Sequence, residues 1–177
     1  MRKFLIFILM LGVALSLVAA PLPPAQVKIT LTTKVPEFLA HGFLTDDDGE
    51  EVIVSSTSVY NAFDAEGARF TYAVKTNVSF PLTVSAEITP FQGEHDGTVS
   101  IKGIYVKPSQ SEQEVAASPA GVGTLGDRYD LFSFSPNISG MATYAYSVRV
   151  VADQDEVADA AVGNYESTVS IGISTQY

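Results

Sequence analysis

The sequence predicts an all-β protein that is built as a sandwich of short strands. Two observations carry this prediction. Segments in which apolar and polar residues alternate recur along the chain, and residues typical of turns separate them at the intervals of sandwich strands. No segment sustains the 3.6-residue period of an amphipathic helix. With 46% hydrophobic and 17% charged residues, the 177-residue chain is suited to one globular core.

The first residues have the composition of a secretory signal peptide, predicted to span residues 1–20. Arg2 and Lys3 precede an apolar run, residues 4–18, that is too short for a comfortable membrane span. Small residues favour cleavage after Ala20, with cleavage further on as the alternative. Removal takes away two of the 10 basic residues and none of the 20 acidic ones, so the formal charge changes from −10 to −12. Export is therefore expected, and an uncleaved membrane anchor is the competing interpretation.

Charge and cysteine content exclude several classes of protein. A strongly acidic chain repels phosphate groups, which argues against nucleic acid or an anionic membrane surface as the main partner. The chain contains no cysteine, so neither a disulfide framework nor a thiolate metal site is possible. Stability is therefore expected to come from packing and from strand pairing.

Residues 21–35 are predicted to form an N-terminal extension. Its first four residues, three of them proline, suit an exposed polyproline II segment. A strand pattern follows, with three apolar positions on one face: Val27, Ile29 and Leu31. Pro36 interrupts this pattern because proline cannot donate to a strand ladder. The sandwich domain is therefore expected at residues 36–177.

The middle of the chain alternates between predicted strands and turns. Strands are predicted at residues 52–54, 59–60, 70–75, 82–88, 99–106, 129–134 and 144–151. Turns rich in aspartate and glycine are predicted at residues 45–49 and 94–97, and Gly103 suggests a β-bulge. Residues 108–126 are predicted to form a long surface loop with a helical turn at its centre, and residues 153–161 one short helix.

The last segment of the chain has the most regular alternation. One face carries its large apolar residues, which are Tyr165, Val169, Ile171, Ile173 and Tyr177. Gly163 and Asn164 can adopt the positive φ of a tight turn, so one strand is expected from Tyr165 to the end. An apolar terminal strand without a later segment to pair with leaves an edge that another molecule has to cover.

These features together resemble the pilin subunits of the chaperone–usher pathway. Gly163 lies 14 residues before Tyr177 (177 − 163 = 14), and the C-terminal signature of that family has a glycine at this distance and a tyrosine at or next to the end. The absence of cysteine departs from type 1 and P pilins. It is similar to the cysteine-free major pilins of CS1 and colonisation-factor fimbriae.

The resemblance implies an immunoglobulin-like sandwich that lacks its last strand and is completed by a donor strand from another subunit. The donor face would be Val27, Ile29 and Leu31. The acceptor strand would run from Tyr165 to Tyr177, centred on Val169, Ile171 and Ile173, and would also contact a periplasmic chaperone. Gly163 would introduce it. The alternative is that residues 27–31 pair within their own sheet as an ordinary first strand.

The resemblance also implies a function and a location. The chain would be a shaft subunit of a surface fimbria that supports adhesion or biofilm formation. Its partners would be identical or related pilin subunits, the chaperone and an outer-membrane usher, with no membrane span in the mature chain. The alternative is a monomeric secreted binding module that recognises carbohydrate or protein, with Tyr105, Tyr129 and Phe132 as candidate stacking residues. Alternating aromatics in a β protein are, however, more often part of the core.

Residues suited to catalysis or metal binding are scarce. Glu94, His95 and Asp96 are better explained as a solvated turn than as part of a serine–histidine–aspartate site, and His41 is the only other histidine. The acidic residues at 46–51 lack the alternate-position spacing of an EF-hand loop, so a polar turn is favoured over a calcium site. No enzymatic activity and no cofactor are predicted.

Overall fold

A computed structural model describes residues 32–47, 50–94, 96–136 and 140–175. The chain divides into two compact units, Met1–Val35 and Pro36–Tyr177. In the first unit only residues 32–35 are described, and these are exposed and belong to no strand. The predicted signal peptide and the predicted donor face, Val27, Ile29 and Leu31, lie outside the described residues.

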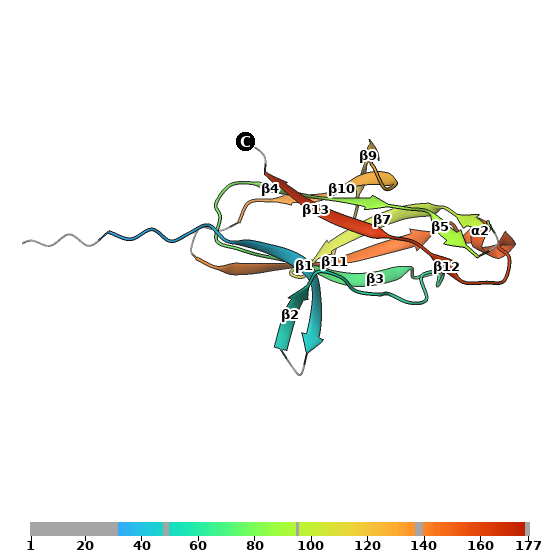
Figure 1. Ribbon diagram of the computed structural model, residues 1–177, viewed down its shortest axis with the longest axis horizontal. Helices are drawn as coiled ribbons and strands as arrows, with labels where there is room; N and C mark the ends of the chain where they lie inside the picture. Colours follow the sequence, from blue (N-terminus) through green and yellow to red (C-terminus); the bar gives the residue numbers. More distant parts are fainter. Residues whose placement is uncertain (1–31, 48–49, 95, 137–139, 176–177) are drawn as a thin grey trace, which may run out of the picture. The chain divides into compact units, whose positions relative to one another are not determined.

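The second unit is all-β, as predicted, and its strands form three sheets (Figure 1). The first has the order β2 (Glu50–Val54), β1 (Leu39–Asp47), β3 (Ala68–Thr76), β11 (Ala142–Ala152), β7 (Ile101–Pro108), β8 (Val115–Ala116). The second has the order β13 (Val169–Thr175), β4 (Leu82–Ile88), β10 (Asp127–Phe134), β9 (Ser118–Val122). A small third sheet contains β12 (Tyr165–Glu166), β5 (Phe91–Gly93) and β6 (Thr98–Val99). The pairings between these strands are antiparallel.

The two larger sheets share one hydrophobic core. The first sheet contributes Tyr72, Val74, Ile104 and Val148, and the second contributes Leu82, Val84, Ile88 and Leu131. The burial of β4 alternates from residue to residue without a break, as expected for a strand with one face in the core. Packing of inward faces from two antiparallel sheets is consistent with a β-sandwich.

A smaller core lies around the third sheet. Phe91, Val99 and Ala152 are buried there, and Phe63 and Tyr165 pack against them. The predicted short helix is confirmed as α2 (Gln154–Asp159), whose N-cap residue Asp153 accepts a hydrogen bond from the backbone N–H of Asp155. Within the described part of the chain, no helix has the length and apolar character that crossing a membrane requires.

Most of the predicted strands are confirmed, including those at residues 70–75, 82–88 and 144–151. β5 and β6 pair on either side of the predicted turn at 94–97, of which His95 lies outside the described residues, and the N–H of Gly93 donates to the carbonyl of Gly97 at 2.7 Å. The predicted bulge is also confirmed, because the register of β11 against β7 shifts immediately after the pairing of Val151 with Gly103.

Three local predictions are wrong. Residues 59–60 form no strand; they lie in an irregular segment, residues 55–61, where Tyr60 is 82% exposed. The predicted loop at 108–126 instead contains β8 and β9, because β7 and β10 each offer a free edge for pairing. Residues 45–47 of the predicted turn at 45–49 belong instead to β1, which pairs with β2 as far as Asp47 and Glu50.

Candidate functional site

The candidate site lies along β13, which has one unpaired edge. β13 pairs with β4 on one side, and no strand of the described chain pairs with its other side. The inward residues of β13 are Val169, Ile171 and Ile173, which pack against the core but are only partly buried. Their register partners in β4, Ile88, Ala86 and Val84, are 0–2% exposed. The inward face of β13 is therefore partly open along its unpaired edge.

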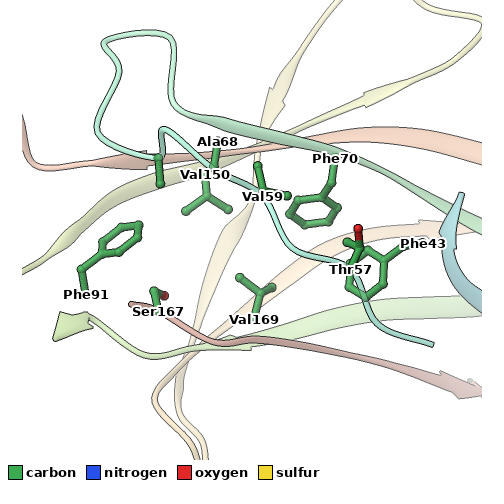
Figure 2. A pocket seen from close by; sticks show the side chains of 10 residues that line it. Phe43, Thr57, Val59, Ala68, Phe70, Phe91, Val150, Ser167 and Val169 are labelled. Carbon is green, nitrogen blue, oxygen red and sulfur yellow. The ribbon is translucent and has the colours of Figure 1, made fainter. Parts of the chain in front are cut away.

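A row of hollows follows this edge. The central hollow has a volume of about 120 Å³ and lies between β13 and the first sheet (Figure 2). Its apolar lining consists of Phe43, Val59, Ala62, Ala68, Phe70, Phe91, Val150 and Val169. A second hollow shares Phe43 and Val169 with it and continues along β13 to Ile171, past His41 and Tyr72. We call these two hollows together the edge groove.

The wall of the edge groove opposite β13 is formed by β1, β3 and the irregular segment 55–61. Phe43 in β1 packs edge-on against Phe70 and Tyr72 in β3, with ring centroids 5.4 Å and 6.5 Å apart. Thr57 and Val59 of the irregular segment line the central hollow (Figure 2). The sequence analysis assigned none of these wall residues to a binding groove. The alternation around Phe70 predicted a strand with a buried face, whereas no local pattern indicated that Phe43 or Val59 would face a hollow.

The predicted single strand from Tyr165 onwards is wrong, because it is divided between two sheets. Tyr165 lies in β12, pairs with Gly93 and packs against Phe63 with ring centroids 5.4 Å apart. The chain then crosses to β13 through Ser167 and Thr168. The Ser167 hydroxyl donates to the carbonyl of Thr89 at 2.7 Å, and the Thr168 N–H donates to the Thr89 hydroxyl oxygen at 2.9 Å. Thr89 therefore fixes the crossing point, and Tyr165 does not share the face of β13.

The backbone of Gly163 and Asn164, which precede this segment, also differs from the predicted tight turn. Neither Gly163 nor Asn164 adopts a positive φ. Instead, the Asn164 side-chain amide donates to the carboxylate of Glu94 at 2.6 Å and ties the segment to the β5–β6 turn. Tyr177 lies outside the described residues. Of the predicted acceptor residues, the structure thus brings Val169, Ile171 and Ile173 together, whereas Tyr165 belongs to the third sheet and Gly163 lies near Glu94.

One polar pair belongs to the edge groove. The Tyr72 hydroxyl lies 2.8 Å from Nδ1 of His41. Tyr72 is fully buried, and this burial raises the pKa of its hydroxyl. His41 is exposed towards the hollow, and its partial burial lowers the pKa of the imidazole. Burial is therefore the cause of both shifts.

The three aromatic residues considered for carbohydrate stacking pack against neighbouring side chains of the protein. Phe132 stacks on Tyr146 with ring centroids 3.7 Å apart, and Tyr129 packs against the main core. The guanidinium of Arg149 lies 4.4 Å from the ring centroid of Tyr105. These contacts give the three side chains structural roles.

The charged groups singled out by the sequence do not form a metal centre in the described part of the chain. Asp46, Asp47, Glu50 and Glu51 lie at the end of the β1–β2 hairpin. No group of three or more histidine or acidic side chains among the described residues is arranged to hold a metal ion. A network that the sequence did not reveal joins Glu114 to Arg69 at 2.9 Å and to Arg149, and the bond to Arg149 lowers the pKa of the Glu114 carboxyl.

No protein-family model and no curated protein matches the chain. Function is therefore inferred from the geometry of the edge groove and from the sequence.

Proposed function

We propose that the chain is a structural subunit of a chaperone–usher surface fimbria. In this proposal the sandwich is immunoglobulin-like and incomplete, and a strand from another copy fills the edge groove by β-strand addition. The observation that carries the proposal is the contrast between Ile171 in β13, which is partly exposed, and its register partner Ala86, which is 2% exposed. An inward-facing apolar row beside a free edge is where an added strand would bury most surface.

The N-terminal extension has the sequence that such a groove requires. Val27, Ile29 and Leu31 recur at every second position, so one face of an added strand would present three aliphatic side chains. The groove lining offers Phe43, Phe70 and other apolar side chains to receive them. Each aliphatic side chain removed from water would contribute about 1.5–3 kcal/mol. The backbone of the added strand would also pair with the free edge of β13.

Repetition of this contact produces a fibre. The donor segment and the edge groove are different surfaces, so the contact is heterologous and does not close on itself. The open edge is also an aggregation template before assembly, which explains the need for a periplasmic chaperone that covers it. In this proposal the subunit then passes through the outer-membrane usher to a surface fimbria that supports adhesion or biofilm formation.

The donor assignment is tested by Ile29→Asp, with Thr30→Asp as the matched control. The first variant would place a charge in the apolar groove, whereas the second places the same charge on the opposite face of the strand. Both proteins are produced with the candidate chaperone and examined by size exclusion and negative-stain microscopy. We expect Ile29→Asp to abolish fibres and leave the chaperone-bound subunit folded, and Thr30→Asp to assemble.

Two outcomes would contradict the proposal. If Ile29→Asp also prevented folding in the chaperone complex, residues 27–31 would be an ordinary strand of their own sheet. If the unaltered chain remained a stable, soluble monomer without any partner, the alternative of a secreted binding module would be favoured.

A further inference from the structure

His41 is the one histidine among the described residues, and it lies at the edge groove. It belongs to the part of β1 that pairs with β3, opposite Val74. Its imidazole lines the same hollow as Val169 and Ile171 of β13. The side chain is exposed while the groove is open, although its Nδ1 is 2.8 Å from the hydroxyl of the fully buried Tyr72. A strand that occupies the groove would cover this ring.

The hydrogen bond to Tyr72 determines which protonation state of His41 is favoured once a strand occupies the groove. A neutral imidazole with its proton on Nε2 accepts the Tyr72 O–H at Nδ1. Protonation turns Nδ1 into a donor, removes the acceptor that the buried hydroxyl uses, and adds a charge. A charge is tolerated while the ring is exposed to water and is costly once a strand covers it.

We propose that the bound strand covers His41 in its neutral form, so that protonation of His41 weakens strand binding and makes assembly of the subunit sensitive to pH. This inference rests on the proposed function and assigns His41 as the residue of the groove that links strand binding to protons.

None of the described residues that line the hollow around His41 carries a charge that would stabilise the protonated ring. Tyr72 of β3 is the titratable group that faces it, and β13 contributes Thr168, Val169, Ser170 and Ile171 to the hollow, none of which is charged. Segment 55–61 contributes Ser55, and the β9–β10 turn contributes Leu125. Glu87 of β4 does not line the hollow, and its carboxylate accepts the N–H of Leu125 at 3.1 Å. Lys75 of β3 lines a separate hollow with Ala40 and Leu44.

The direction of the pH effect follows from these surroundings. Burial already lowers the pKa of His41 below its usual value of 6.5 in the open groove. A covering strand would lower that pKa further, so binding releases a proton when the pH is below the pKa of the open form. The affinity for the strand is therefore highest above the pKa of His41 in the open groove. Below that pKa it falls by up to about tenfold for each pH unit, until the pKa of the bound form is reached.

The test uses a fluorescent peptide with the sequence of residues 26–35, blocked at both ends. This sequence contains no histidine and no acidic residue, so the peptide itself does not titrate between pH 5.5 and 8. The acceptor is the full chain with Ile29→Asp, which prevents its own extension from competing. Affinity is measured by fluorescence polarisation across this pH range, with His41→Asn and His95→Asn introduced separately. Asparagine at position 41 still offers an oxygen acceptor to Tyr72 but does not titrate.

We expect the acceptor and its His95→Asn variant to bind the peptide several-fold more weakly at pH 5.5 than at pH 8. The His41→Asn variant should bind with the same affinity at both pH values. Circular dichroism checks its folding, and His41→Gln serves as a second variant. Proton NMR of the imidazole gives an independent readout, since the pKa of His41 should be lower with peptide bound than without it.

The outcomes separate this inference from the proposed function. The same pH dependence in the acceptor and in both His41 variants would overturn the role of His41 and leave the strand-binding groove intact. An unchanged pKa of His41 on peptide binding would do the same. No peptide binding at any pH would overturn the groove itself, and this inference with it.

Discussion

The second sheet has two outer edges, and they are built in different ways. At one edge, β9 is five residues long, is exposed along its whole length, and contains Pro119 and a glycine, Gly121, with φ of 101°. Its register with β10 shifts between Arg128 and Tyr129. At the other edge, β13 has seven residues that pair with β4 without a shift and alternate regularly in burial.

Under the proposed function, the two edges would have different roles. A short, irregular strand that contains proline is poorly suited to pairing with another chain, and natural proteins protect their sheet edges in this way. β13 contains no proline and has a regular ladder, and its inward side chains are partly exposed. The chain thus carries protection at one edge and lacks it at the other. An edge left open beside an apolar groove is the expected form of a site that pairs with a strand from outside.

The largest expected effect comes from covering the edge of β13. We move residues 26–35 behind Tyr177 through a flexible linker, so that the donor strand becomes intramolecular. Burial of Val27, Ile29 and Leu31 would add about 5–9 kcal/mol at most, and each kcal/mol raises the unfolding midpoint of a chain of this size by about 2–4 °C. The midpoint should therefore exceed that of the same chain without residues 26–35 by roughly 10 °C or more, as measured by thermal denaturation followed by circular dichroism.

The control for this experiment carries Ile29→Asp in the moved segment. It should lose most of the gain, because the charge cannot enter the apolar groove. If the chain without residues 26–35 were already as stable as the completed one, the edge of β13 would need no cover.

The next largest effect is expected for Ile171→Ser, which removes an aliphatic side chain that lines the edge groove. Ile171 is only partly buried while the groove is open, so the free energy of unfolding should fall by about 1–2 kcal/mol in the chain without donor residues. In the completed chain the same side chain is covered, and the loss should be about 2–5 kcal/mol. Urea unfolding of both chains measures the difference.

Ser174→Thr is the matched control for that prediction. Ser174 is exposed, pairs in register with Thr83, and lines neither hollow of the edge groove. The substitution should change the free energy of unfolding by less than about 0.5 kcal/mol in both chains. Equal losses for Ile171→Ser in the open and completed chains would mean that the added strand does not cover this residue.

The sequence predicts β13 well and its surroundings poorly, for a physical reason. Alternation reports which residues share a face, and it correctly grouped Val169, Ile171 and Ile173. It does not report where a strand changes sheets, which here depends on hydrogen bonds from Ser167 and Thr168 to the distant Thr89. The opposite wall of the groove likewise depends on how β1 pairs with β3, and this brings Phe43 to the hollow. Such long-range pairing has no local signal.

The smallest expected effect is at the protected edge, where Pro119→Thr would give β9 a further backbone donor. Pro119 pairs in register with Tyr129, and proline is tolerated in an edge strand when the position of its missing N–H faces solvent. Threonine favours strands and would supply that N–H, so copies of the chain should associate weakly through β9. The free energy of unfolding should change by less than about 0.5 kcal/mol, because the site is exposed.

The completed chain is used to test this prediction, so that β13 is covered and cannot contribute to association. Sedimentation velocity at increasing protein concentration should then detect a small dimer fraction in Pro119→Thr and none in the parent. Identical sedimentation of the two proteins would mean that the shifted register and Gly121 protect this edge without the proline.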